Sequence, residues 1–370
     1  MKRELRCSAQ VVGLALHPAA PVCAAGLVDG ALELWRFGWT TGEREDGAGK
    51  AIDHGSSSSS KGSSSSSSSS FACSSAPGGE GGSPGGKVTV KVPAAHTDST
   101  RVVAFCGRDG ARLVTGSADR AVKCWDAGTA ALSWEVIGAH ENAVNCLLPL
   151  ESVADGAMLV SGDEEGEIKL WDVRVGGKPL ATVKQHDDYI SDMAFDEKRK
   201  TLLSTSGDGM LSAFDLRATS KAKLKHKATS DKHDEDLLSL VVIKNGSKVV
   251  VGTQNGVLDF WNWGEWGDIA DRFPGHPESI DSILKIDEST ICTGSSDGIL
   301  RIINVYPHKL LGVMGDHTDF PIERLAWSHD RTMIASASHD AVIRFWDTSA
   351  AAKRMKKSRD ADDDDFYADM

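Results

Sequence analysis

The sequence lacks the features of a secreted, membrane-bound or metal-binding protein. Its seven cysteines are scattered, with neither a CxxC pair nor the spacing of a metal site, which favours reduced thiols in the cytosol or nucleus. The first ten residues, MKRELRCSAQ, are too polar for a signal-peptide core. The most apolar stretch, residues 11–28, is interrupted by His17, Pro18 and Pro21. We therefore expect neither secretion nor membrane insertion.

The sequence also lacks common enzyme motifs and any excess of basic charge. It has no GxxxxGK[ST] phosphate loop and no HExxH metal motif. The 53 Asp and Glu residues outnumber the 41 Lys and Arg residues, and the net charge of −12 argues against a protein that coats nucleic acid. Hydrophobic residues make up 40% of the chain, enough to build a sizeable core.

The sequence does contain an internal repeat of about 43 residues, which indicates a repeat architecture. Each of seven segments ends in a small-residue strand, an Asp-Gly-like turn and a second strand, as in SADRAVKCWD (117–126) and ASHDAVIRFWD (337–347). The closing positions, aromatic in six of the seven repeats, are Trp35, Trp125, Trp171, Phe214, Trp261, Ile303 and Trp346. The repeat length predicts an all-β protein, a seven-bladed WD40 β-propeller with four strands per blade.

Two segments fall outside this repeat. Residues 38–86 hold two serine runs and GGEGGSPGG, a composition that cannot bury enough apolar surface to order itself. We predict a propeller over 1–37 and 87–349, a disordered Ser/Gly-rich insertion over 38–86 in blade 1, and a disordered basic-then-acidic tail over 350–370. Glu4–Ser8 is expected to supply the outer strand of the last blade and close the ring.

Histidine, hydroxyl and acidic residues recur at fixed positions in each repeat. The acidic or amide turn residue lies six positions before the closing residue: Asp29, Asp119, Glu165, Asp208, Asn255, Asp297 and Asp340. This pattern resembles the buried Asp–His–Ser/Thr–Trp network of WD-repeat proteins. Two repeats carry it whole, and their residues are His96, Thr115, Asp119, Trp125, and His317, Ser336, Asp340, Trp346. Because a catalytic triad occurs once and this set recurs at blade spacing, we predict a structural network, no catalytic or metal site, and no enzyme.

Repeats one and five depart from this pattern. Ala25 replaces the hydroxyl of the first repeat, which also lacks the histidine, and the fifth has Val251 and Asn255. We expect these blades to rely on packing instead.

Several features beyond the propeller pattern are predicted on the face opposite the turns. Asp172-Val173-Arg174 and Asp215-Leu216-Arg217 resemble the WDxR boxes of cullin-4 ubiquitin-ligase receptors, although arginines paired with nearby acids on the rim would look the same. Trp263 and Trp266 are either exposed contact anchors or packing residues. Residues 217–232 are rich in Lys and Arg, which suits a local phosphate contact or a protected sheet edge. We predict that these features form one protein-docking arc over blades three to five.

The repeat-specific residues 186–192 (HDDYISD), 262–268 (NWGEWGD) and 273–281 (FPGHPESID) resemble the WD repeat-containing protein 55 family. That resemblance implies a non-enzymatic scaffold of the nucleus and nucleolus that binds preribosomal factors in rRNA production and ribosome biogenesis. Plant relatives imply the alternative of a substrate receptor that binds the cullin-4 adaptor. A nuclear-address cluster fits this location: Lys353, Arg354, Lys356, Lys357 and Arg359. We expect no cofactor and no small-molecule ligand; an indirect or weak RNA contact and a cytoplasmic pool stay open.

Overall fold

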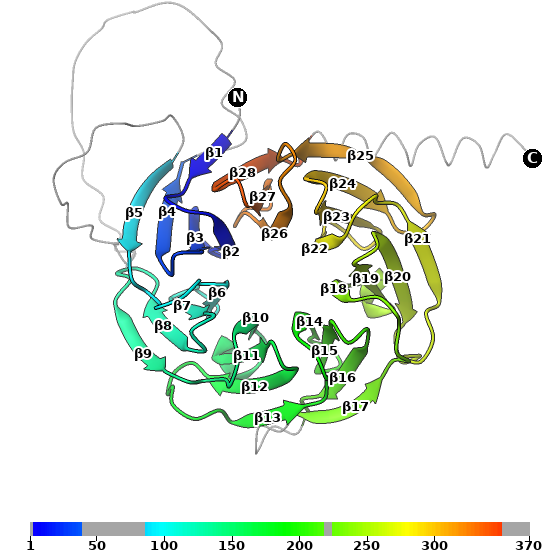
Figure 1. Cartoon of the computed structure of the whole chain (residues 1–370), viewed down its shortest axis with the longest axis horizontal. Coiled ribbons are helices and arrows are strands. Elements are labelled where there is room, and N and C mark those ends of the chain that lie inside the picture. Colours follow the sequence, from blue (N-terminus) through cyan, green and yellow to red (C-terminus); the bar gives the residue numbers. More distant parts are fainter. Residues whose placement is uncertain (1–2, 39–85, 218–223, 350–370) are drawn as a thin grey trace, which may run out of the picture.

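The structure is a computed structural model that describes residues 3–38, 86–217 and 224–349, which form a closed ring of seven four-stranded antiparallel sheets (Figure 1). This confirms the all-β, seven-bladed propeller expected from the repeat. Of the predicted insertion over 38–86, residues 39–85 lie outside the described part of the chain, as does the predicted tail over 350–370, whereas Gly86 begins the outer strand of blade 1.

Within each of blades 1 to 6, the four strands follow chain order from the centre of the ring to its outside. Blades 1 to 3 comprise β2 (Val11–Leu16), β3 (Val22–Leu27), β4 (Leu32–Phe37), β5 (Gly86–Val92); β6 (Val102–Cys106), β7 (Arg112–Gly116), β8 (Val122–Asp126), β9 (Leu132–Val136); and β10 (Val144–Leu150), β11 (Met158–Asp163), β12 (Glu167–Asp172), β13 (Ala181–Lys184).

Blades 4 to 6 follow the same order. They comprise β14 (Ile190–Asp196), β15 (Thr201–Ser206), β16 (Leu211–Asp215), β17 (Lys225–Thr229); β18 (Leu237–Ile243), β19 (Lys248–Thr253), β20 (Val257–Asn262), β21 (Asp271–Pro274); and β22 (Ile280–Lys285), β23 (Thr290–Ser295), β24 (Ile299–Asn304), β25 (Lys309–Asp316). Two 3₁₀ turns, η1 (Ala154–Gly156) and η2 (Lys244–Gly246), join the first two strands of blades 3 and 5.

Blade 7 joins the two ends of the described chain. It comprises β26 (Ile322–Trp327), β27 (Met333–Ser338), β28 (Val342–Asp347) and β1 (Arg3–Arg6). β1 pairs antiparallel with β28, and its Leu5 is buried between blades 7 and 1. The N-terminal segment therefore closes the ring, as the sequence predicted, and removes the open edge that β28 would otherwise present.

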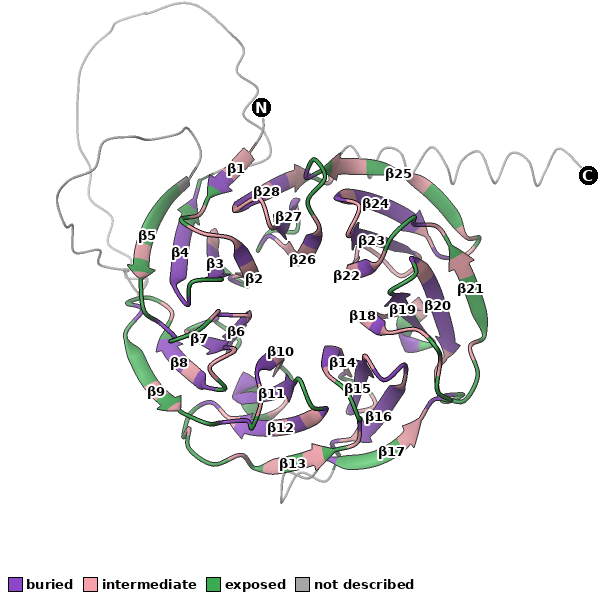
Figure 2. Cartoon of the chain, in the orientation of Figure 1, coloured by how far each residue is buried: buried purple, intermediate pink, exposed green. Residues whose placement is uncertain are grey.

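Burial is greatest in the second strands, whereas the innermost strands are partly buried and the outer strands are the most exposed (Figure 2). The second strands β11, β15, β23 and β27 are buried along their whole length, whereas the outer strands β9 and β17 are mostly exposed. The apolar side chains pack between neighbouring blades; Trp261 of blade 5, for example, contacts a cluster that includes Leu203 and Leu211 of blade 4. Each blade is thus stabilised by its neighbours, which is why the ring must close.

We call the end of the ring that carries the turns between second and third strands, such as the turns of Asp119 and Asp340, the top end. The bottom end is the opposite one, where the third strands finish at residues such as Asp172 and Asp215. Because β28 runs from the top turn to Asp347, the described chain finishes at the bottom end.

A buried histidine ties the top of blade 2 together through both ring nitrogens. His96 Nδ1 lies 3.0 Å from Asp119 Oδ2, and His96 Nε2 lies 2.7 Å from Thr115 Oγ1. Trp125 Nε1 donates to the same hydroxyl at 3.0 Å. Neutral His96 can thus donate from Nδ1 and accept the Thr115 hydroxyl proton at Nε2, and every polar atom of the set has a partner.

Blade 7 contains the second predicted set in the same arrangement. His317 contacts Asp340 at 3.1 Å and Ser336 at 2.7 Å, and Trp346 Nε1 donates to Ser336 at 2.7 Å. Burial lowers the pKa of both His96 and His317, which keeps each imidazole neutral. Blade 4 uses His186, Asp208 and Ser204 in this way, with Phe214 in place of the tryptophan.

Blade 3 carries the network too, but through a different acid from the one predicted. His140 Nδ1 lies 3.0 Å from Asp163 Oδ2, and its Nε2 lies 2.6 Å from Ser161. Glu165, which the sequence spacing selects, is 60% exposed and pairs with Lys184 on the surface. Asp163 caps the turn through Glu165 N–H and also accepts the histidine, so it combines two roles that separate residues perform in blade 2.

Three blades replace the network. In blade 1, Glu33 accepts Trp35 Nε1–H at 3.2 Å and the Ser8 hydroxyl at 2.6 Å, so a polar network stands where packing alone was expected. In blade 5, His233 packs edge-on against Trp261, with ring centroids 5.6 Å apart. In blade 6, His276 Nε2 is hydrogen bonded to the Thr293 hydroxyl, but the turn acid Asp297 pairs with Arg301 instead of the histidine, with Arg301 Nη1 3.0 Å from Asp297 Oδ1.

The imidazole of His140 also lies near a second carboxylate, and this group is the one place in the described chain where three potential metal ligands converge. Glu167 Oε2 lies 3.6 Å from His140 Nδ1, but Lys169 Nζ lies 2.8 Å from the same carboxylate oxygen. Because both ring nitrogens of His140 are already hydrogen bonded and an ammonium group holds Glu167, the cluster is built as a polar network.

Candidate protein-docking surface

At the bottom end, the third strands of blades 3 and 4 finish in loops of the same Asp–apolar–Arg sequence. Arg174 donates from Nε to Asp172 Oδ1 at 3.0 Å and from Nη2 to Oδ2 at 2.6 Å. Arg217 Nε donates to Asp215 Oδ2 at 2.9 Å, and its Nη2 contacts the same oxygen. The two arginine side chains are 54% and 67% exposed. Each guanidinium is therefore held by its own carboxylate while it faces solvent.

The residue between Asp and Arg explains this shape. Val173 and Leu216 are both buried, and each packs between its blade and the preceding one. Their backbone N–H groups donate to Ala157 O at 2.8 Å and to Lys200 O at 2.9 Å. Since neighbouring side chains of an extended segment point in opposite directions, an inward middle residue turns the flanking acid and arginine outward together.

The paired charges act on each other strongly. The hydrogen bond from Arg217 is the main reason why the pKa of Asp215 falls to about 2, and the Arg174 side chain likewise lowers the pKa of Asp172. The same contacts raise the pKa of each arginine. Both carboxylates stay ionised and both guanidiniums stay charged at any physiological pH, so the two pairs keep their shape. We call these two pairs, Asp172 with Arg174 and Asp215 with Arg217, the forks.

A cleft of about 450 Å³ opens beside Arg174, between blades 2 and 3. Arg112 and Trp134 line it, and both donate to the carbonyl of Val173, Trp134 from Nε1 at 2.9 Å. Val175, at its edge, is 78% exposed. Cationic, aromatic and apolar groups thus meet next to the first fork. The sequence reading missed Arg112 and Trp134, because they come from blade 2 and only the ring places them beside blade 3.

Trp263 occupies the same loop position in blade 5 as Val173 and Leu216 in blades 3 and 4. Its backbone N–H donates to Ser247 O at 2.9 Å, the bond that recurs at this place in the other blades. The ring is half-buried beneath Arg199, whose guanidinium carbon lies 4.5 Å from the ring centroid. Trp266 is only 5% exposed and meets Trp263 edge-on at 5.1 Å. Trp266 therefore fits the packing alternative, and of the two only Trp263 stays partly exposed.

The structure places Arg174, Arg217 and Trp263 in equivalent bottom loops of three consecutive blades, where the predicted arc requires them. Of the basic stretch, Lys225 and Lys227 are exposed on the outer strand β17, whereas residues 218–223 lie outside the described part. The nuclear-address cluster from Lys353 to Arg359 also lies outside it.

Seven four-stranded blades with recurring His–hydroxyl–acid sets define a WD-repeat propeller. The chain belongs to the WDR55 family, whose sequence profile matches residues 85–351. It is 33% identical to WD repeat-containing protein 55 of Arabidopsis thaliana over 344 residues, which cover 93% of this chain and 82% of the relative. It is 33% identical to the Homo sapiens protein of that name over 335 residues, covering 90% and 73%. WD repeat-containing protein JIP5 of Coprinopsis cinerea is 44% identical over 180 residues, covering 46% and 43%.

These comparisons support a WD-repeat scaffold, a class that typically binds other proteins and is generally non-catalytic. Within the described residues, no helix is long and apolar enough to cross a membrane.

Proposed function

We propose that this protein is a non-enzymatic scaffold that assembles preribosomal factors in the nucleolus during rRNA production and ribosome biogenesis. The observation that carries the proposal is its membership of the WDR55 family, whose profile spans blades 2 to 7. The buried polar groups support the non-enzymatic part of the proposal, because the His–hydroxyl–acid sets that resemble a hydrolase triad are hydrogen bonded to one another inside the blades. The bottom end carries exposed charged and aromatic groups that the propeller itself does not need, and a scaffold could use these groups to recognise its partners.

The paired forks favour a second candidate, a substrate receptor that binds the adaptor of a cullin-4 ubiquitin ligase. Arg174 and Arg217 are exposed, and each is pre-oriented by its own acid, so little side-chain entropy remains to be lost on docking. Nη1 of each guanidinium makes no hydrogen bond within the described residues, which leaves two N–H groups on each fork for a partner.

Affinity purification of the tagged full chain from cells, followed by mass spectrometry, tests both candidates. The wild type is compared with an Arg174→Ala/Arg217→Ala variant and with Arg36→Ala, which removes an exposed arginine from blade 1. Preribosomal factors recovered with all three proteins support the scaffold and reduce the forks to rim ion pairs. An adaptor recovered with the wild type and Arg36→Ala, but lost from the double variant, supports the receptor. Recovery of neither group with the wild type contradicts both candidates.

A further inference from the structure

The top mouth of the central channel carries a ring of seven side chains, one from each blade. In six inner strands the pairing with the second strand skips one residue, a β-bulge at the same place in every case. In blade 2, Arg101 stands directly before β6 instead. We call the six skipped residues together with Arg101 the mouth ring: Val12, Arg101, Asn145, Ser191, Leu238, Asp281 and Glu323.

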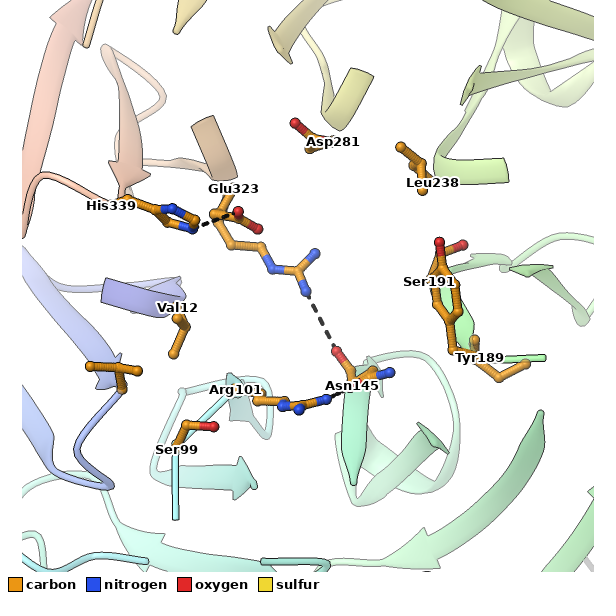
Figure 3. Close-up of a pocket in the computed structure, with 13 residues that line it drawn as sticks. Val12, Ser99, Arg101, Asn145, Tyr189, Ser191, Leu238, Asp281, Glu323 and His339 are labelled. Atoms are coloured by element: carbon orange, nitrogen blue, oxygen red, sulfur yellow. Dashed lines mark hydrogen bonds and ion pairs between the residues drawn. The ribbon is translucent and has the colours of Figure 1, made fainter. Parts of the chain in front are cut away.

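All seven residues of the mouth ring line a cavity of about 340 Å³ (Figure 3). A bulge re-aims one side chain away from the regular ladder, and bulges are common beside functional sites. The regular repeat needs no particular residue at this position, since Val, Leu, Ser, Asn, Asp and Glu all occur there. The mouth ring therefore has the placement of a binding site and a composition that the fold does not dictate.

The acids around the mouth already have hydrogen-bond donors. Glu323 lies 2.8 Å from His339 Nε2, and Asp281 accepts the hydroxyls of Ser279 at 2.9 Å and Ser296 at 2.7 Å. Glu164 receives a guanidinium N–H from Arg101. Each of these carboxylates thus has a donor within the protein and needs no cationic ligand.

Arg324 is the exception among the charged groups that line the cavity. It follows Glu323 on β26 and forms no ion pair within 4.0 Å among the described residues. Its single hydrogen bond there runs from Nη2 to the backbone oxygen of Asn145 at 3.5 Å. The charge of Arg324 also acts on the carboxylates of Asp281 and Asp192, but neither lies within 4.0 Å of it. A guanidinium has five N–H donors and no acceptor, so one long hydrogen bond leaves Arg324 with donors for a further acceptor, ideally an anionic one.

We propose that the mouth ring binds an extended acidic segment of a partner protein, with one Asp or Glu carboxylate of that segment on Arg324 in the channel. Asn145, which also accepts from Arg101 Nη1 at 2.7 Å, places a second guanidinium close to the first. Val12 and Leu238 supply an apolar side for the rest of the segment.

The surrounding charges favour a carboxylate over a phosphate. Glu323 and Asp281 stand in the same ring, so the position on Arg324 itself suits one singly charged carboxylate of the segment better than a phosphate dianion.

The chain has an acidic run of its own, Asp362–Asp365, which is a competing occupant. The described chain finishes at Ser349 at the bottom end, whereas the mouth ring lies at the top, so this run could occupy the ring only by extending past the full height of the propeller, and we assign the site to another protein. The bottom-end surface of the preceding proposal is not involved, so the two proposals fail or succeed separately.

Fluorescence anisotropy with the full chain and a fluorescein-labelled hexa-aspartate peptide tests the proposal. Arg324→Gln should weaken binding of this peptide by about 10-fold or more, the loss expected for a charge-assisted hydrogen-bonded pair. The matched control Arg36→Gln should change it by less than about 2-fold, because Arg36 is exposed on blade 1 outside the cavity. Equal affinities of the wild type and Arg324→Gln would overturn the proposal.

Three further arms separate the alternatives. Tighter binding of hexalysine, of a phosphoserine peptide or of free succinate than of hexa-aspartate would overturn the choice of an acidic protein segment. A chain ending at Ser349 that binds the peptide about 10-fold more tightly than the full chain would identify the tail as the occupant instead. For the case that Arg324→Gln does not fold, a benzophenone-bearing hexa-aspartate peptide should crosslink wild-type protein at Val12, Tyr189 or Leu238, and crosslinks confined to the bottom end would refute the site.

Discussion

Blade 5 contains two buried nitrogens that a single hydroxyl would satisfy. Neither His233 Nε2 nor Trp261 Nε1 has a hydrogen-bond partner within the described residues. The equivalent nitrogens of blade 2 both bond to Thr115, at 2.7 and 3.0 Å. Val251 lies ten residues before Trp261, as Thr115 lies ten before Trp125, and it is fully buried. We therefore predict that Val251→Thr stabilises the protein.

The size of the effect follows from the two orphaned groups. A buried polar group without a partner costs about 1–3 kcal/mol, so pairing two of them recovers at least about 2 kcal/mol. Burying the new hydroxyl costs about 1 kcal/mol in return, and threonine replaces valine without a change of shape. The net gain in the free energy of unfolding is about 1–2 kcal/mol. For a propeller of this length that corresponds to a rise in Tm of about 2–3 °C.

Thermal and urea unfolding, followed by circular dichroism, measure this gain. The reverse change in blade 2, Thr115→Val, orphans two nitrogens and should cost about 2–4 kcal/mol. In a Trp261→Phe background the benefit of Val251→Thr should shrink, because one of the two recipients is gone. A Val251→Thr protein that is less stable than wild type, while Thr115→Val behaves as expected, would refute the equivalence of the two blades.

Three other predictions follow from the blade interiors. In urea unfolding, Asp163→Ala should lower the free energy of unfolding by about 2–4 kcal/mol and Glu165→Ala by less than about 0.5 kcal/mol, because only Asp163 accepts a hydrogen bond from the buried His140. Equal losses would contradict the assignment of this role to Asp163. Burial is the main cause, and the charge of the nearby Arg301 the second, of a pKa lowered to about 4 for His276. Because the unfolded chain binds this proton more readily than the folded one, protonation favours unfolding. The stabilisation that neutral His276 contributes is complete above pH 6.5 and is lost as the pH falls towards 4, by up to about 3 kcal/mol. In urea unfolding over this range, the free energy of unfolding of His276→Gln should fall less than that of the wild type. Parallel pH curves for the two proteins would contradict the assignment. Deletion of residues 42–84 should leave Tm within about 2 °C in a thermal melt, because β4 and β5 are paired up to their flanking ends and five residues still connect them; a large drop would place a blade strand inside the deletion.

Spacing along the chain was enough to predict the blades, because a repeat that recurs every 43 residues fixes which strands pair. It also selected the right partners in blades 2 and 7, where the turns have the same length. Counting back from Trp171 selects Glu165 in blade 3, whereas Asp163 at the end of β11 takes the histidine. A spacing rule cannot distinguish two acids in one turn, since the choice depends on which carboxylate points inward.

The docking surface and the mouth ring were less accessible to sequence reasoning. Two extra tryptophans after Trp261 look exposed because they exceed what the repeat needs. The loop position of Trp263 matches that of Val173, and that comparison alone would have indicated partial burial. The bulges that aim Asp281 and Glu323 into the channel leave no sequence signature, because they are defined by register with the neighbouring strand.

The polar sets of the blades differ far more than their backbones do. Glu33 replaces an entire His–hydroxyl pair in blade 1, and blade 5 keeps its histidine, packed edge-on against Trp261, without the hydroxyl. The fold therefore tolerates exchange at its buried polar positions, and the residues it does not need, the bottom forks and the mouth ring, are free to encode partners. Strands of about six residues keep the two proposed docking surfaces roughly 20 Å apart, so a segment bound at one would not contact the other. Simultaneous occupation of two chemically different ends is what distinguishes a scaffold from a simple binding module.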